Sequence, residues 1–215
     1  YGIRAANGVV LVTTKKGAAG KTRVDYNGFG GFQTVTNQVE MASARKYALM
    51  INERLGSNVV GAYPNTDWYN EILRKPAYVH NHQLAVSGGT EKVTYNVSFG
   101  YLKQEGIVKK NDFERITGRL QNDLKLNDHL KIGFNGIITN SFSTDIPGNI
   151  FNQAYVAPPI IPVRGADGRY GDPANFNVGN FPNPVATLDW YNQRSRNLNL
   201  IGSVYGEVKF LKDFT

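Results

Sequence analysis

Two short aromatic repeats contain the residues of this chain that are best suited to contact a ligand. The tetrapeptide Asp-Trp-Tyr-Asn occurs at residues 67–70 and again at 189–192, and the two copies hold both Trp residues of the chain. Exposed aromatic rings can stack on the apolar faces of sugars, whereas buried aromatic rings anchor a loop. The repeats predict four candidate ligand contacts, namely Trp68, Tyr69, Trp190 and Tyr191. For each of them, anchoring of the loop is the alternative role.

Catalytic and metal-binding chemistry has little support in the residue pattern. His80 and His82 lie two apart and would share one face of a strand, but a metal site needs at least three converging ligands and no acidic residue is close by. The chain has no Cys, and no nucleophile, base and orienting group occur together. We therefore predict no enzyme activity, no metal site and no cofactor, and ordinary structural roles for the histidines.

The elements that must position these residues are β-strands. Apolar and polar residues alternate in residues 92–101, 116–126, 130–138 and 198–210, and more weakly in 24–32 and 84–86. Strict alternation puts one set of side chains on each face of a strand. The sequence thus predicts an all-β fold with about six antiparallel strands.

The connections between these strands alternate in length. Residues 88–91 and 127–129 are short enough for hairpin turns, whereas residues 34–82, 104–112 and 143–197 are longer. In an up-and-down meander, this order puts the short turns at one end and the long loops at the other, as in outer-membrane barrels. A soluble β-sandwich has no reason to keep this asymmetry, although a sandwich that binds carbohydrate stays the alternative interpretation.

The two longest connections differ in content. In the first, Ser43 can cap a short helix that Gly56 can end. The apolar stripe of this helix consists of Tyr47, Met50, Ile51 and Leu55. The connection 143–197 is rich in Pro, Gly and Asn, which predicts turns and extended chain.

Composition excludes two classes of protein. The net charge of +7 comes from dispersed cations, without a basic stripe, so we predict no nucleic-acid binding. No apolar run approaches the about 18 residues of a membrane helix. A membrane protein with this sequence would therefore have to span the bilayer as a barrel.

The opening residues, YGIRAANGVVLVTTKKG, resemble the end of the plug domain in TonB-dependent outer-membrane receptors, in particular the SusC/RagA-like importers of Bacteroidota. Within this segment, residues 9–14 predict a short buried strand, and Lys15-Lys16-Gly17 predict the polar end of that strand. The similarity continues through most of the chain and is weakest in the Pro-rich connection. Its further motifs lie at residues 66–68, 82–101, 104–107, 114–115 and 130–133.

The resemblance implies a plug end at residues 1–17 and, at 18–215, the N-terminal part of an incomplete transmembrane β-barrel. The six strands would belong to a barrel of about 22, with the short helix in an extracellular loop. The implied location is the outer membrane of a Gram-negative bacterium, with the lipid bilayer against the apolar strand faces.

The resemblance further implies active import of glycans, or of peptides, powered by TonB. The implied partners are a SusD-like surface lipoprotein, TonB itself, which would contact a region upstream of these residues, and the oligosaccharide or peptide ligand. The identity of the cargo does not follow from these residues.

Overall fold

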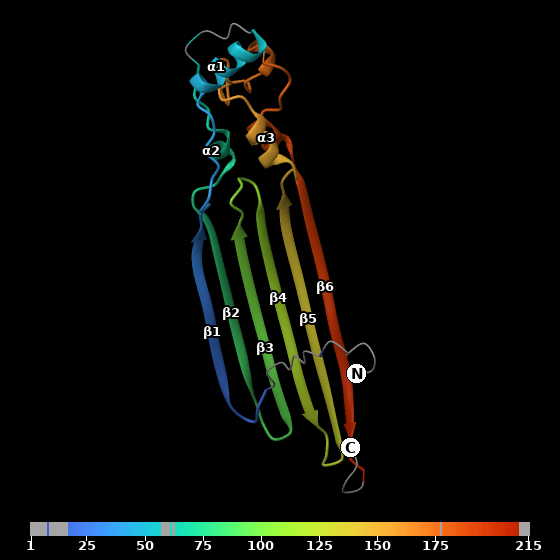
Figure 1. Ribbon diagram of the computed structural model, residues 1–215. Coiled ribbons are helices and arrows are strands. Elements are labelled where there is room, and N and C mark those ends of the chain that lie inside the picture. The colour runs from blue at the N-terminus through green and yellow to red at the C-terminus, as the bar shows by residue number, and fades with distance from the viewer. Residues whose placement is uncertain (1–7, 9–16, 57–60, 62, 177, 211–215) are drawn as a thin grey trace.

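Six long antiparallel strands form one sheet in the computed structural model, which describes residues 8, 17–56, 61, 63–176 and 178–210. The strands are β1 (Gly20–Gln33), β2 (Ala77–Gly89), β3 (Val93–Glu105), β4 (Asp112–Lys125), β5 (Leu130–Asp145) and β6 (Gln193–Val208). Their order in the sheet follows the chain from β1 to β6 (Figure 1). This confirms the predicted all-β meander, whereas a sandwich would place the strands in two sheets with Greek-key crossings.

The connections lie at opposite ends of the sheet according to their length (Figure 1). Residues 90–92 and 126–129 form the short turns, and residues 34–76, 106–111 and 146–192 form the long connections, which we call the loop cap. β2, β5 and β6 extend further toward the cap than the alternation predicts. Polar and charged residues at these strand ends interrupt the apolar pattern there, which is why the sequence places the boundaries too far from the cap.

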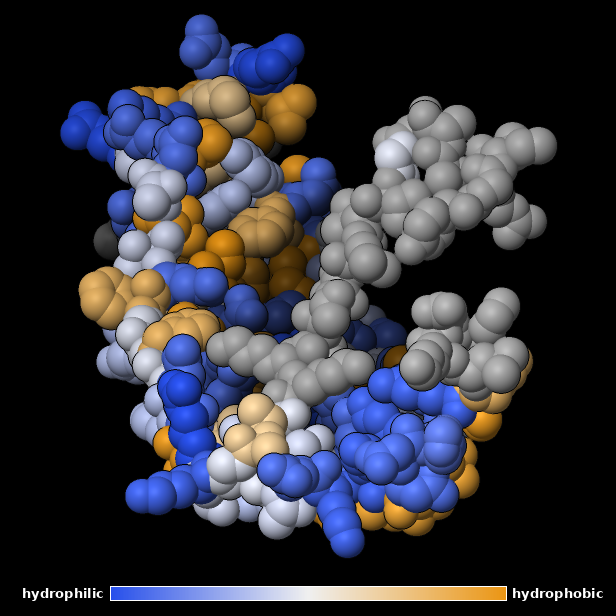
Figure 2. Space-filling model, turned by 90° about the horizontal axis from the view of Figure 1, so that it is seen from below, coloured by the Kyte–Doolittle hydropathy of each residue, from blue (hydrophilic) through white to orange (hydrophobic). Residues whose placement is uncertain are grey.

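The strand register brings apolar side chains of all six strands to one face, which we call the apolar face. Val97 of β3, for example, pairs with Val86 of β2 and with Leu120 of β4. The exposed side chains on the apolar face include Val24, Tyr26, Leu84, Val97, Phe99, Leu120, Ile132, Phe134, Ile138, Leu198, Leu200, Val204 and Val208. In Figure 2, which looks along the strands, hydrophobic residues gather along the outer edge of the sheet at lower right, with hydrophilic residues inside them.

The opposite face is polar along most of β4. It carries the side chains that the alternation assigned to it in β4, namely Thr117, Arg119, Gln121, Asp123 and Lys125. Asp123 is buried, forms an ion pair with Lys131 at 3.3 Å, and accepts a hydrogen bond from the Tyr205 hydroxyl. This face therefore uses hydrogen bonds and ion pairs between strands where the apolar face exposes hydrocarbon.

The predicted helix in the first connection is confirmed as α1 (Ala44–Leu55). Ser43 accepts a hydrogen bond from the Lys46 amide, and Gly56 ends the helix in the left-handed conformation at φ 60°. The remaining helices were not predicted: α2 (Trp68–Ile72), α3 (Ile150–Val156), the 3-10 helix η2 (Pro173–Phe176) and α4 (Pro184–Trp190). α4 begins at Pro184, and the Asn183 side chain accepts hydrogen bonds from the next two free amides, so its start follows ordinary capping rules.

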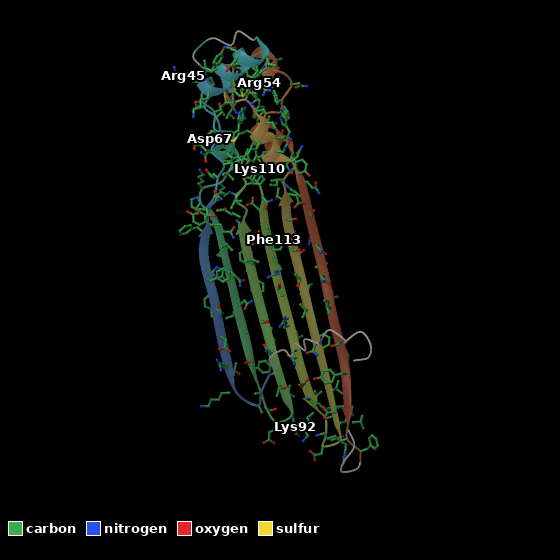
Figure 3. All side chains as sticks on the ribbon, viewed as in Figure 1. Arg45, Arg54, Asp67, Lys92, Lys110 and Phe113 are labelled. Atoms are coloured by element: carbon green, nitrogen blue, oxygen red, sulfur yellow. The ribbon has the colours of Figure 1, made fainter. Side chains whose placement is uncertain are left out.

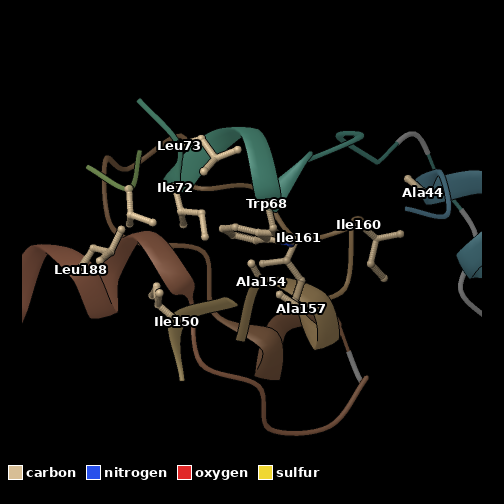
Figure 4. Packing of buried hydrophobic residues seen from close by; sticks show 11 residues of the cluster. Ala44, Trp68, Ile72, Leu73, Ile150, Ala154, Ala157, Ile160, Ile161 and Leu188 are labelled. Atoms are coloured by element: carbon tan, nitrogen blue, oxygen red, sulfur yellow. The ribbon is translucent and has the colours of Figure 1, made fainter. Parts of the chain in front are cut away.

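The hydrophobic core of the described residues lies in the loop cap, not on the sheet. Trp68, Ile72, Ile150 and Ile160 belong to it and are at most 3% exposed (Figure 4). Ala44 and Leu73 come from the first connection, Val108 from the second, and Ala154 and Leu188 from the third. The three long connections therefore pack into one unit above the sheet.

Among the described residues, no helix has the length and apolar character needed to cross a membrane. The predicted plug strand at residues 9–14 and the polar residues 15–16 lie outside the described part of the chain.

Candidate ligand-contact site in the loop cap

The first Asp-Trp-Tyr-Asn copy lies inside the loop cap. Asp67 caps α2 by accepting a hydrogen bond from the Asn70 amide at 3.0 Å. Trp68 is 3% exposed, and its indole N–H donates to the Pro158 carbonyl at 2.9 Å. Tyr69 packs against Phe151 and Tyr155, with ring centres 5.6 and 5.3 Å away. Trp68 and Tyr69 thus fasten the first connection to the third, as the anchoring alternative expects.

The second copy lies at the surface. Trp190, the last residue of α4, is 75% exposed and meets the Tyr170 ring edge-on at 5.4 Å between ring centres. Tyr191 follows α4, and its hydroxyl donates to the Gln193 side chain at the start of β6. Of the two Trp residues, Trp190 is therefore the one whose ring is open to a ligand, and its role as a ligand contact stays a prediction.

Asp189 holds the surroundings of Trp190 in place. Its carboxylate lies 2.7 Å from Lys110 Nζ and 3.6 Å from the Arg164 guanidinium, and it accepts a hydrogen bond from the Tyr170 hydroxyl. Lys110 comes from the connection between β3 and β4, at the loop end of the sheet (Figure 3). A single carboxylate thus joins the second and third connections directly beside the exposed indole.

The Arg164 side chain completes this arrangement. Its guanidinium carbon lies 4.0 Å from the centre of the Tyr170 ring, and its nitrogens donate to the Tyr170 hydroxyl and to the Gly168 carbonyl at 2.8 and 2.9 Å. Trp190, Tyr170 and Arg164 together form what we call the aromatic ledge. A ledge of this kind offers an apolar ring face for stacking and nearby hydrogen-bond donors, which suits a sugar ring or an aromatic side chain.

The electrostatics of the ledge follow from these contacts. The hydrogen bond from Lys110, followed by that from Tyr170, holds the pKa of the Asp189 carboxyl below its ordinary value. The same hydrogen bond to Asp189 raises the pKa of the Tyr170 hydroxyl, because it favours the protonated phenol. Asp189 is therefore ionised at neutral pH and supplies a fixed negative charge beside the aromatic ledge.

Local sequence patterns give no signal for Tyr170, Arg164 and Lys110. Arg164 and Tyr170 flank a tight turn in which the two residues form an isolated bridge, and Lys110 belongs to a different connection. Only the register of β3 with β4 and the packing of α4 bring these residues to Asp189. The Asp-Trp-Tyr-Asn repeat indicates Trp190 as a candidate contact and gives no signal for these three neighbours, and the contact itself stays a prediction.

His80 and His82 lie on the apolar face of β2. His82 Nδ1 lies 2.7 Å from the Tyr26 hydroxyl, and the His80 ring packs against Tyr101 with ring centres 5.7 Å apart. No group of three or more His, Asp or Glu residues that could hold a metal ion occurs among the described residues. Both histidines therefore contact residues of a neighbouring strand, in the interior of β2 rather than in a loop or at a strand start.

Sequence comparison relates the chain to curated receptors. It is 32% identical over 217 residues to TonB-dependent receptor P26 of Formosa agariphila, a match that covers 95% of this chain and 22% of the relative. It is 30% identical over 234 residues to TonB-dependent receptor SusC of Bacteroides thetaiotaomicron, covering 98% of this chain and 23% of the relative. A comparison with protein-family models gave no match.

The chain belongs to the SusC/RagA-like TonB-dependent receptors. It spans less than a quarter of the length of the curated family members it matches. Solved structures of the RagAB peptide importer share its fold, with TM-scores of 0.70 in the closed-closed state and 0.72 in the open-open state. At 19 and 20% identity, these matches cover 99% and 97% of this chain and 29% and 28% of the other.

Proposed function

We propose that this chain forms part of the wall of an outer-membrane β-barrel that actively imports glycans, or peptides, with energy supplied through TonB. The proposal rests on one observation: in this chain, which belongs to the receptor family, one face of the sheet is apolar and the other is more polar. A sheet that exposes apolar residues on one face of six paired strands needs a nonaqueous environment on that face.

The height of the apolar face supports a membrane setting. On β3, the apolar residues run from Val93 to Tyr101, and the eight residue-to-residue steps between them extend about 27 Å along the strand at about 3.4 Å each. A tilt of about 40° reduces this to about 20 Å across the bilayer, comparable to the apolar band of about 25 Å on outer-membrane barrels. The polar face would then line the lumen or contact the plug.

The domain assignment is part of the same proposal. Residues 1–17 would end the plug domain, and residues 18–215 would begin a barrel of about 22 strands. The short turns would face the periplasm and the loop cap would face outside, where a SusD-like lipoprotein and the ligand approach. The RagAB importer, which shares this fold, takes up peptides, whereas the exposed ring of Trp190 also suits a glycan.

Localisation and uptake test the proposal in the full-length protein. We expect the protein in the outer-membrane fraction, and we expect growth on its oligosaccharide or peptide cargo to stop when TonB is deleted. A full-length product recovered in a soluble fraction, or uptake that is independent of TonB, would contradict the proposal.

The aromatic ledge has a test of its own. Trp190→Ala should weaken ligand binding by about five- to tenfold, because a stacked aromatic contributes about 1 to 1.5 kcal/mol, while leaving the thermal unfolding of the receptor unchanged. The matched variant Trp68→Ala should instead lower stability by about 3–5 kcal/mol, since it removes a buried ring from the core of the cap. Titration calorimetry and thermal scans separate the two effects, and unaltered affinity in Trp190→Ala removes the ledge as a ligand contact.

A further inference from the structure

A groove of about 290 Å³ opens at the loop end of strands β3 to β6. Its charged and aromatic lining on the apolar face consists of Lys103, Asp112, Glu114, Phe142, Arg194 and Arg196. The register places Lys103, Glu114, Phe142 and Arg196 in one row across these strands. Phe113, which also lines the groove, marks its level in Figure 3.

The positive charge of the groove is concentrated on β6. Among the described residues, neither Arg194 nor Arg196 has an ion pair, and both side chains are exposed. Arg196 is held in place, because its Nε donates to Asn140 at 3.2 Å and its guanidinium carbon lies 5.2 Å from the centre of the Phe142 ring. These contacts leave the terminal guanidinium nitrogens of Arg196 available.

One of the two acidic residues of the groove is compensated by an ion pair, because Arg74 lies 2.8 Å from the Asp112 carboxylate. The other, Glu114, is directly opposite Lys103 in the strand register. The positive charges of the groove that have neither an ion-pair partner among the described residues nor an acidic residue opposite them in the register are therefore at the β5–β6 side, on Arg194 and Arg196, and an entering anion would bind there. Next to the arginines there, the Thr144 hydroxyl offers a further hydrogen-bond donor.

The groove directly adjoins the hydrocarbon surface of the sheet. Arg196 is followed on the same face of β6 by Leu198 and Leu200, which are 61% and 75% exposed. An occupant that fills both regions must carry a negative group at one end and an apolar chain at the other. A phosphate-bearing membrane lipid has this chemistry.

We propose that Arg194 and Arg196 bind the phosphate of a lipid headgroup in the leaflet next to the loop cap, with the acyl chains lying along Leu198 and Leu200. The proposal rests on the proposed function, because it requires the apolar face to meet the bilayer. Arginine suits this role, since its planar guanidinium can donate two parallel hydrogen bonds to one phosphate. The lipid would fix the height of β6 in the membrane.

Native mass spectrometry of the full-length receptor tests the proposal. Receptor is released from mixed micelles that contain equal amounts of phosphatidylglycerol and phosphatidylcholine, and the retained lipids are counted. We expect preferential retention of phosphatidylglycerol, with a loss of about fivefold for each arginine changed, because a cation near an anionic surface contributes about 1 kcal/mol. The test variant is Arg194→Gln/Arg196→Gln.

Two controls make the result decisive. Arg119→Gln removes an exposed arginine from the polar face and should leave lipid retention unchanged, and Arg194→Lys/Arg196→Lys should keep most of it. Added inorganic phosphate should not displace the lipid, since free phosphate lacks the acyl chains. Equal retention in the glutamine variant and the wild type, or displacement by phosphate alone, would overturn the proposal.

The same variants distinguish this inference from the proposed function. Folding is checked by the heat-dependent mobility of the barrel in gels. If the glutamine variant reaches the outer membrane and still retains phosphatidylglycerol as the wild type does, only the lipid site is wrong. If the wild type does not reach the membrane, the function proposed above is wrong as well.

Discussion

Asp189 shows how one carboxylate can join two connections at the surface of the loop cap. It lies in the cap between a lysine of one connection and an arginine and a tyrosine of another, and each of these partners favours its ionised form. The exposed Trp190 ring packs against Tyr170, whose hydroxyl donates to the Asp189 carboxylate. The ledge is therefore sensitive to the charge of a single carboxyl group.

This sensitivity predicts a dependence on pH. The pKa of Asp189 is lowered in the folded protein, so its contribution to stability is complete above the ordinary carboxyl pKa of about 4 and is lost as the pH falls through the lowered value. We expect faster proteolysis of the connection 146–192 below about pH 4 in full-length receptor. Asp189→Asn should show fast proteolysis already at pH 7 and a flatter dependence on pH. A wild-type rate that does not change with pH would contradict this expectation.

Residue types alone indicated where aromatic chemistry lies and left its use undecided. The sequence assigns the same four letters to residues 67–70 and 189–192, yet burial separates Trp68 from Trp190. What decides between anchor and exposed ring is the packing of α3 and α4, which depends on contacts between distant connections. Such contacts have no local signature in the sequence.

At the scale of elements, the strands were predictable because their alternation is dictated by the two environments they face. β3 and β4 show it throughout their centres, and both are found where the pattern puts them. The short helices were missed for the opposite reason. α2, α3 and α4 have five to seven residues, too few for a helical period to emerge from the turn-forming residues around them.

The two faces of a strand should respond differently to the same added charge. Val97→Lys places an ammonium group on the centre of the apolar face and should cost about 2–4 kcal/mol of folding stability in a bilayer. The matched variant Ser98→Lys adds the charge one residue further along β3, on the polar face, and should cost less than about 1 kcal/mol. Urea titrations of the full-length protein in lipid vesicles measure both. Equal costs would mean that the apolar face does not meet lipid.

At the scale of the whole molecule, the described wall has exposed hydrocarbon on one face and two unpaired edges, at β1 and β6. In water, each of these features favours association with further copies. The cap has a compact core, whereas the described sheet below it leaves its apolar face uncovered.

The isolated 215-residue chain should therefore aggregate in plain buffer and become dispersed only in detergent. Size-exclusion chromatography and sedimentation in the two media provide the measurement. A monodisperse monomer in buffer, with a cooperative thermal transition, would show that the apolar face is covered in some other way.

The shared core of the loop cap also bears on the order in which such a wall can assemble. Each pair of strands joined by a long connection contributes residues to that core: Trp68 between β1 and β2, Val108 between β3 and β4, and Leu188 between β5 and β6. Once the core has formed, the loop ends of the three hairpins are tethered side by side, and the loops that remain to be closed between them are shorter. We therefore expect strand pairing to proceed from the cap toward the short turns, because the tethered loop ends already place the three hairpins next to one another.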